Sequence, residues 1–408
     1  MKPEPAPAEP GRLRTGLGRA ALALSALSAV ALVAAAALVL LPPPSYDVWQ
    51  LALLVLEFAL VPAGVALAGT ALAVLALRWT TWRRTSTVVA GLNAVALVAA
   101  LVPPVALWNT ARHHDVSLSL PDYVAGLAVD TDRAPETVRY ATVDGEDLML
   151  DVWRPGKPGT GEPLPVVINV HGGAEDYPQS MFPRWDTWLA DQGYVVFDID
   201  YRFFPHGDWQ AAPGDVKCAV SWVRRHAKDY GADPDRIALM GQSAGGLLTL
   251  LASYSTDEQI PSSCPEHRES TDVQAAIAWY TATDATEAAV LPWRLRHSAE
   301  IGPDLEQQQE RMTGAVAGTE QARRLNRALS PITYVDAQAP PTLLIQAGHD
   351  LFVSPEDIRA FADRLERAGV THRVLSLPWT EHMFDLNWGG FASQITREVL
   401  ARFLAERL

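Results

Sequence analysis

The stretch of sequence that decides the fold is Gly241-Gln242-Ser243-Ala244-Gly245-Gly246. It lies between an apolar run at 236–240, which predicts a buried strand, and a helical pattern at 244–254. Small residues on both sides of a serine at a sharp strand-to-helix turn let the flanking backbones approach and leave the hydroxyl exposed. The stretch therefore predicts that Ser243 is a nucleophile at a helix N-terminus, which favours developing negative charge.

Short β-rich runs alternate with helical runs around this turn, from about residue 136 to residue 408. This alternation predicts an α/β fold with a mostly parallel eight-stranded sheet and helices on both faces. The expected strands are 138–142, 148–153, 165–170, 194–199, 236–240, 275–280, 342–347 and 373–377, with a turn at Asp144-Gly145 between the antiparallel first two. The expected helices are 182–191, 216–228, 244–254, 355–368 and 392–408. The more polar segment 284–330 is expected to form a lid-like helical insertion over the sheet.

A glycine-rich loop, His171-Gly172-Gly173-Ala174, follows the strand expected at 165–170. A tetrahedral intermediate is stabilised by backbone N–H groups directed at its oxyanion, and glycines allow the backbone to come close. We therefore expect an oxyanion hole made by the N–H groups of Gly173 and of Ala174 or Gly172, together with that of Ala244. His171 is expected to be structural.

The predicted nucleophile needs a histidine base and a carboxylate that orients the histidine. At a nucleophile turn of this kind the chain order is serine, acid, histidine. His382 lies just beyond the last expected strand and is the candidate base, with His206 as a weaker competitor. Asp350 directly follows the strand expected at 342–347 and is the candidate acid. Asp284 follows the preceding strand and is the alternative acid.

These motifs resemble those of the hormone-sensitive-lipase-like esterases and the related feruloyl-esterase-like (BD-FAE-like) group. The shared features are His171-Gly172-Gly173, Asp200-Tyr201-Arg202, the block around Ser243, and Ser330-Pro331 ahead of the strand that leads to Asp350. The resemblance covers about residues 136–408 and implies the α/β-hydrolase fold with a triad serine hydrolase activity. Ala174 in the oxyanion loop and Gln242 before the serine favour the broader hydrolase group over a true lipase.

The expected activity is that of a carboxylesterase that cleaves small-molecule esters through a Ser-His-Asp triad and an acyl-enzyme. This chemistry needs no cofactor and no metal. The same triad would serve an acyltransferase, in which a second alcohol replaces water, or a serine peptidase. A non-catalytic receptor on a hydrolase fold is a further alternative, although such proteins usually lose a triad member and this chain retains a candidate for each.

The first 110 residues carry three apolar stretches long enough to cross a bilayer, at about 17–41, 48–77 and 87–108. Glu57 lies inside the second stretch, where a charge is costly, so the span either begins after it or turns it toward another helix. We expect a transmembrane region at 1–110, a linker at 111–135 and a catalytic domain at 136–408. A cleaved signal peptide or buried soluble helices are the alternatives.

Basic residues alternate along this region in a way that predicts its orientation. Four Lys or Arg precede the first span, none lies between the first two, three lie between the second and third, and one follows. Because cytoplasmic loops are enriched in Lys and Arg, the N-terminus is expected in the cytoplasm and the catalytic domain on the extracytoplasmic side of the cell membrane.

Net charge divides unevenly between the two parts of the chain. Residues 1–115 hold eight Lys/Arg and five Asp/Glu, a net charge of 8 − 5 = +3. Because the whole chain has a net charge of −14, the remainder has a net charge of −14 − 3 = −17. An acidic domain is repelled by nucleic acid, so nucleic-acid binding is excluded. The two cysteines, Cys218 and Cys264, have no metal-binding spacing and allow one disulfide if the domain lies outside, or two buried thiols.

Overall fold

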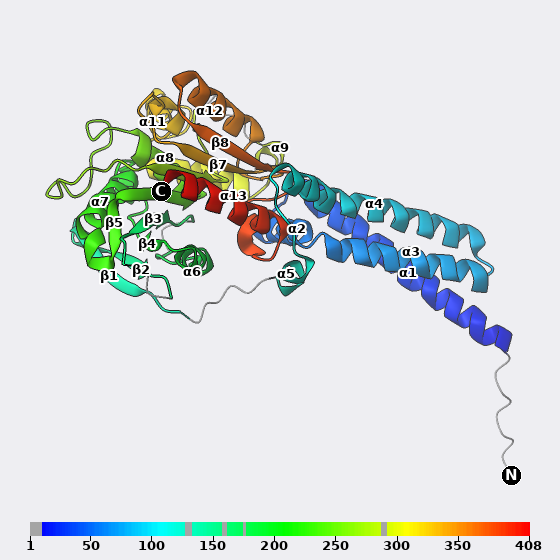
Figure 1. Cartoon of the computed structure of the whole chain (residues 1–408). Helices are drawn as coiled ribbons and strands as arrows, with labels where there is room; N and C mark the ends of the chain where they lie inside the picture. The colour runs from blue at the N-terminus through cyan, green and yellow to red at the C-terminus, as the bar shows by residue number, and fades with distance from the viewer. Residues whose placement is uncertain (1–9, 127–132, 157–160, 174–176, 287–291) are drawn as a thin grey trace, which may run out of the picture. The chain divides into compact units, whose positions relative to one another are not determined.

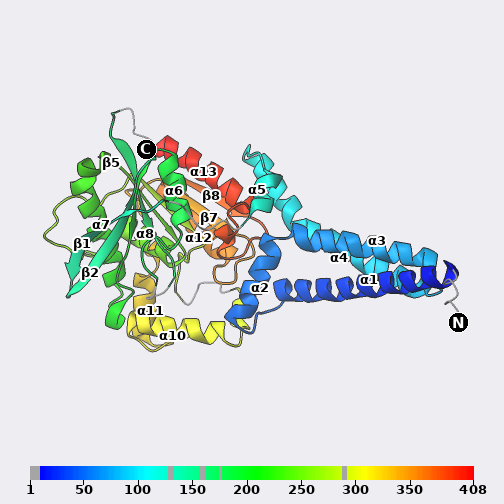
Figure 2. The same ribbon diagram turned by 90° about the horizontal axis from the view of Figure 1, so that it is seen from below.

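The computed structural model describes residues 10–126, 133–156, 161–173, 177–286 and 292–408, and the chain divides into two compact units, Met1–Asn109 and Thr110–Leu408. Figures 1 and 2 show an N-terminal helical part and a mixed α/β part.

The first unit consists of the helices α1 (Pro10–Leu40), α2 (Tyr46–Glu57), α3 (Leu60–Trp79) and most of α4 (Arg83–His113). Among the described residues, three helical segments have the length and apolar composition to cross a membrane: Leu13–Leu40, Leu60–Trp79 and Arg83–His113. The second expected span, 48–77, is not one continuous helix, and the structure agrees with the alternative in which the span begins after Glu57. The helix breaks at Phe58, and α2 ends at Glu57, so the candidate span begins after the charged residue.

A buried polar cluster joins α1, α3 and α4. Asn93 donates to the carbonyl of Ser25 at 3.1 Å, and Ser28 donates to Asn93 Oδ1 at 2.8 Å. A Cβ atom on Gly69 would overlap both Asn93 Oδ1 and Ser28 Oγ, so only glycine permits this close approach. Interhelical hydrogen bonds beside a small residue are typical of helices that associate in a membrane.

Segment 111–135, expected as a linker, contains the end of α4 and a short helix, α5 (Leu120–Ala125). Ser119 caps α5 by accepting the N–H of Asp122, and Pro121 stands at its first turn, where a missing N–H is tolerated. Gln394 binds the backbone of Ser119, at 2.7 Å to its N–H and 2.9 Å to its carbonyl. The segment is therefore attached to the catalytic unit through backbone hydrogen bonds.

The second unit is built on one eight-stranded sheet in the order β1-β2-β4-β3-β5-β6-β7-β8. Strand β2 runs antiparallel to β1 and β4, and the pairs from β4 to β8 are all parallel. The strand bounds are β1 (Glu136–Val143), β2 (Glu146–Trp153), β3 (Leu164–Val170), β4 (Val195–Ile199), β5 (Ala232–Gln242), β6 (Ala275–Trp279), β7 (Thr342–Ala347) and β8 (His372–Leu377). All eight expected strands are confirmed. The continuous apolar runs of β3, β4, β6 and β7 are buried along nearly their whole length, as strands covered on both faces are.

Helices cover both faces of the sheet, as expected. One face carries α7 (Ala211–His226), α8 (Ala244–Tyr254) and α12 (Pro355–Ala368), whose apolar side chains pack with strand residues in two hydrophobic cores. The other face carries α6 (Pro183–Asp191) and α13 (Phe391–Arg407) (Figures 1 and 2). Parallel strands have their carboxyl ends at one edge, so the loops after β3, β5, β7 and β8 lie along that edge.

Segment 284–330 contains α9 (Trp293–Arg296), α10 (Ile301–Thr313) and α11 (Glu320–Ala328), which confirms that the insertion is helical. The C-terminal end of α10 approaches the short 3₁₀ helix η1 (Pro205–Gly207) closely. A Cβ atom on Gly207 would lie 2.8 Å from the Cα of Gly314, and both glycines have positive φ. Two glycines therefore allow backbone-to-backbone packing between the insertion and the loop after β4.

Candidate active site

Ser243 occupies a strained turn between β5 and α8. Its backbone has φ 52° and ψ −119°, a conformation that non-glycine residues rarely adopt. Cβ atoms on Gly241 or Gly245 would collide with backbone, the first with the Gly245 carbonyl and the second with the carbonyls of Val170 and His171. The two glycines therefore make the turn sterically possible, as the sequence predicts.

His382 and Asp350 lie next to this serine. His382 Nε2 is 2.9 Å from Ser243 Oγ, and His382 Nδ1 is 3.0 and 3.1 Å from the two carboxylate oxygens of Asp350. All three sit in loops at the carboxyl ends of the parallel strands β5, β7 and β8. The tertiary structure thus brings the three residues predicted for a triad into one hydrogen-bonded chain.

The surroundings of His382 restrict its ring. The rings of Tyr280 and Phe352 lie 4.6 and 4.8 Å away, measured between centroids. Asp350 Oδ1 also accepts the N–H groups of Phe352 at 2.8 Å and Val353 at 3.1 Å. The carboxylate is therefore fixed by backbone donors, and aromatic packing keeps solvent away from the imidazole.

Asp284, the alternative acid, makes contacts with other residues than His382. Asp284 accepts the N–H of Thr286 at 2.8 Å and lies 3.4 Å from Ser330 Oγ, so it fixes its own loop. The side chain of His206 lies outside the described residues. Asp350, and not Asp284, is the carboxylate in contact with His382.

The predicted oxyanion loop follows β3 and packs against the nucleophile turn. A Cβ atom on Gly172 would lie 2.7 Å from the Gln242 carbonyl and 3.1 Å from Ser243 Cβ. Gly173 has φ +99°, and a side chain there would overlap the Tyr177 ring. Ala244 is the first residue of α8, and Ala174 lies outside the described residues. The expected loop thus lies beside Ser243, with glycine required where the backbones meet.

Residues from the Asp200-Tyr201-Arg202 run support this loop from behind. The Tyr201 hydroxyl donates to the His171 carbonyl at 2.9 Å, and the two rings stack with centroids 4.6 Å apart. His171 Nδ1 lies 2.8 Å from the Gly172 carbonyl. Burial lowers the pKa of His171, but Asp200 and Asp198 outweigh it and the net direction is upward. His171 is therefore structural, as expected.

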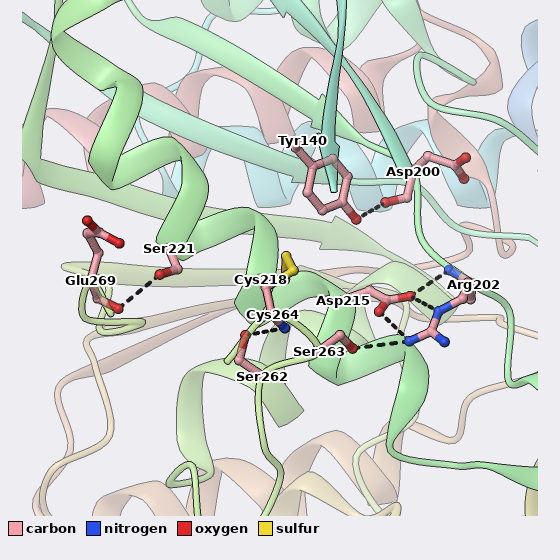
Figure 3. Close-up of a disulfide and its surroundings, with 10 residues drawn as sticks. All are labelled: Tyr140, Asp200, Arg202, Asp215, Cys218, Ser221, Ser262, Ser263, Cys264 and Glu269. Atoms are coloured by element: carbon pink, nitrogen blue, oxygen red, sulfur yellow. Dashed lines mark hydrogen bonds and ion pairs between the residues drawn. A yellow bond between two sulfur atoms is a disulfide. The ribbon is translucent and has the colours of Figure 1, made fainter. Parts of the chain in front are cut away.

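Arg202 extends this support to α7 (Figure 3). Its guanidinium binds Asp215 at 2.8 and 2.9 Å, and its Nη2 lies 3.2 Å from Ser263 Oγ. Asp215 is fully buried and also accepts the N–H of Arg202, so the ion pair has backbone reinforcement. The interpretation of Tyr201 and Arg202 as packing and hydrogen-bonding residues agrees with these contacts.

Cys218 on α7 and Cys264 form a disulfide, with Cα atoms 5.2 Å apart. Figure 3 places this bond beside Ser263, the residue that contacts Arg202. His267 lies close to both sulfurs, but sulfurs in a disulfide offer no thiolate to a metal ion. The open question from the sequence, one bridge or two thiols, is answered in favour of the bridge.

A buried carboxyl pair was missed in the sequence. Asp186 and Asp198 are fully buried, and Asn169 donates to both at 2.9 Å. Burial raises the pKa of Asp186 to about 7 and raises that of Asp198, which also feels the charge of Asp186. Burial and mutual repulsion therefore both favour the protonated form of these carboxyls. The available signal was Asp198 inside the apolar strand β4, since α6 is of mixed polarity.

Sequence analysis assigned no role to Glu381 and Arg294, which form a buried ion pair at 2.7 Å next to His382. The available signal was an acidic residue directly before the predicted base, in a loop that must lie inside the domain.

The fold and the position of Ser243 define the class: the second unit is an α/β-hydrolase. The chain belongs to the BD-FAE family, whose family model matches residues 150–365. This confirms the resemblance seen in the sequence.

Two similar proteins are named as ester hydrolases. The probable carboxylic ester hydrolase LipM of Mycobacterium tuberculosis is 34% identical over 262 residues, covering 63% of this chain and 58% of LipM. Esterase LipQ of the same organism is 32% identical, covering 64% of this chain and 59% of LipQ. The chain therefore spans less than two thirds of the length of these relatives.

Solved structures of a Thermogutta terrifontis esterase, Est2, share the architecture. The form phosphonylated by sarin has a TM-score of 0.56 and 25% identity, covering 71% of this chain and 98% of that one. The butyrate-bound form has a TM-score of 0.53 and 25% identity, covering 67% and 94%.

Proposed function

We propose that this chain is a membrane-anchored carboxylesterase in which Ser243 is the nucleophile, His382 the general base and Asp350 the orienting acid. The observation that carries the proposal is the chain of contacts Ser243 Oγ–His382 Nε2 (2.9 Å) and His382 Nδ1–Asp350 (3.0 Å). Distances of this size allow proton transfer from the hydroxyl and fix the imidazole tautomer.

In the first step, Ser243 Oγ attacks the ester carbonyl carbon while His382 Nε2 takes the hydroxyl proton. The tetrahedral intermediate carries an oxyanion, which the N–H groups of Gly173, of Ala174 or Gly172, and of Ala244 stabilise. The carbon–oxygen bond to the alcohol then breaks, and His382 passes its proton to the leaving alkoxide. Asp350 stabilises the imidazolium during both transfers.

In the second step, water attacks the acyl-enzyme while His382 accepts a proton from it. Collapse of the second tetrahedral intermediate releases the carboxylic acid, and the proton returns to Ser243. Backbone amides, the imidazole and water supply all the chemistry that this mechanism needs.

Small-molecule esters are the proposed substrates. The relatives named above are esterases, and Est2 has been seen with bound butyrate. We infer that short acyl esters are the first substrates to test here. No contact of the described residues favours an acyltransferase or a peptidase over a hydrolase.

We further propose that the three long apolar helices anchor the chain in the cell membrane, with the catalytic unit on the extracytoplasmic side. The lengths of these helices support the anchoring. The distribution of Lys and Arg supports the orientation, and the buried disulfide agrees with an oxidising compartment.

The test is an assay of the full-length chain in detergent on nitrophenyl esters of increasing acyl length, with Ser243→Ala alongside. We expect hydrolysis by the wild type, loss of turnover in the variant, and stoichiometric organophosphate labelling at Ser243 detected by mass spectrometry. Activity that survives in a folded Ser243→Ala variant would overturn the assignment of the nucleophile.

A further inference from the structure

A second carboxylate, that of Glu381, lies beside the proposed triad and joins two of its loops. Glu381 is fully buried. Its Oε1 accepts the N–H of Leu351 at 2.5 Å and the N–H of His382 at 3.0 Å. Leu351 directly follows Asp350, so a single oxygen binds the backbone next to the acid and the backbone of the base.

The other oxygen of Glu381 binds an arginine from the helical insertion. Arg294 on α9 places Nη1 2.7 Å from Glu381 Oε2 and 3.3 Å from the His349 carbonyl. Arg294 is 7% exposed. The guanidinium therefore contacts the residue before Asp350 directly and, through Glu381, the backbone N–H of His382.

The charges of this pair depend on each other. Burial raises the pKa of Glu381, the nearby Asp350 raises it further, and Arg294 lowers it. A buried carboxylate without a cation would be strongly unfavourable, and so would a buried guanidinium without an anion. The net direction for the pKa of Glu381 is upward, and the 2.7 Å ion pair with Arg294 is the contact that favours its charged form near Asp350.

A neutral acceptor would be enough to bind the N–H groups of Leu351 and His382. A charged Glu381 carboxylate therefore also has an electrostatic effect on its surroundings. A carboxylate next to His382 favours the imidazolium that forms during proton transfer, and the cation of Arg294 opposes it. The pair is therefore placed to influence both the geometry and the charge state of the base.

We propose that Glu381 and Arg294 are a positioning pair for the reaction, which holds the Asp350 and His382 loops in register and ties both to the insertion at α9. Neither residue needs to touch substrate. This inference rests on the proposed function, because it assumes that His382 and Asp350 act on Ser243.

Glu381→Gln separates charge from hydrogen bonding, since a glutamine oxygen still accepts both N–H groups. We expect kcat to fall by less than about tenfold. We expect the acidic limb of the kcat/KM profile to move to lower pH by about half to one unit, because the imidazolium loses a favourable charge. Glu381→Ala removes the acceptor as well, and its kcat should fall by about 10- to 100-fold.

Asp215→Asn is the matched control, because it neutralises another fully buried carboxylate paired with an arginine. In the described structure, Asp215 makes no hydrogen bond to the loops of Asp350 and His382. The control should leave the acidic limb where it is in the wild type. Organophosphate labelling of Ser243 in each variant counts the folded sites, so kcat is expressed per active site.

If the proposed function is wrong, the wild-type protein itself will be inactive on esters. If only the role of the Glu381–Arg294 pair is wrong, the wild type will be active and the variants will not show the expected changes. A folded Glu381→Gln variant with an unmoved acidic limb would overturn the proposal. If that variant does not fold, Arg294→Lys decides, since it keeps the charge but loses the planar fork. The proposal requires a lowered kcat with the acidic limb near its wild-type position, and an unchanged kcat would refute it.

Discussion

The Nε2 atom of His382 lies 2.9 Å from the Oγ atom of Ser243, although 139 residues separate the two in the chain. The contact exists because β5 and β8 are parallel members of one sheet, so the loops after them open at the same edge. Ser243 is held by a strained turn that glycines make possible, and His382 by aromatic neighbours and a carboxylate. The predictions below test these arrangements in the full-length chain.

Asp350→Asn should lower kcat for ester hydrolysis by about 10⁴-fold with little change in folding, because an amide stabilises the wrong imidazole tautomer. Asp284→Asn is the control, since Asp284 contacts Thr286 and Ser330 rather than His382. Steady-state kinetics of the two variants checks this. A larger loss in Asp284→Asn would reverse the assignment of the acid.

Gly245→Ala should destabilise the catalytic unit by about 1–3 kcal/mol or prevent folding, since the new methyl group would overlap the carbonyls of Val170 and His171. Gly156→Ala should have little effect, because open space surrounds that position. Urea unfolding followed by tryptophan fluorescence measures both. Equal stabilities of the two variants would show that the turn tolerates a side chain.

The free energy of unfolding should fall between about pH 4 and pH 7 because of Asp186. Burial raises its pKa to about 7 in the folded protein, while an unfolded aspartate titrates near about 3.9. In this window the folded state binds more protons than the unfolded state, so its stability decreases as pH rises and levels off above about pH 7. Asp186→Asn should flatten this decrease, as measured by urea unfolding at a series of pH values. An unchanged slope would argue against a proton held by the Asp186–Asp198 pair.

Cys218→Ser with Cys264→Ser should lower the free energy of unfolding by about 4 kcal/mol, because the bridge closes a loop with a sequence separation of 46. Reduction of the wild type should have a similar effect. Thiol titration of the denatured, unreduced wild type should find no free cysteine. Two titratable thiols in protein isolated from the membrane would contradict both the bridge and the argument from it for an oxidising compartment.

Protease added to intact spheroplasts should digest the C-terminal unit and spare an N-terminal tag, if the distribution of basic residues sets the orientation. Immunoblots for tags at both ends read this out, and lysed spheroplasts show that both tags are cleavable. Protection of the C-terminal tag, with loss of the N-terminal one, would invert the proposed topology.

The sequence by itself determined the strands, the nucleophile turn and the apolar helices. These depend on periodicity and on sterics between residues close in the chain: apolar runs mark buried strands, and Gly241 and Gly245 permit the turn at Ser243. The sequence did not decide whether a helix breaks after Glu57, because a local pattern does not show whether one charge interrupts a long apolar run.

Only the tertiary structure decided which groups meet. Asp350 and Asp284 both follow strands of the sheet. Because β7 pairs directly with β8, the loop after β7 places Asp350 next to His382. The Cys218–Cys264 bridge, the Asp186–Asp198 pair and the Glu381–Arg294 pair likewise join segments far apart in sequence. Their partners are set by how helices and loops pack on the sheet, because buried charges and thiols have no local periodicity that reveals what they contact.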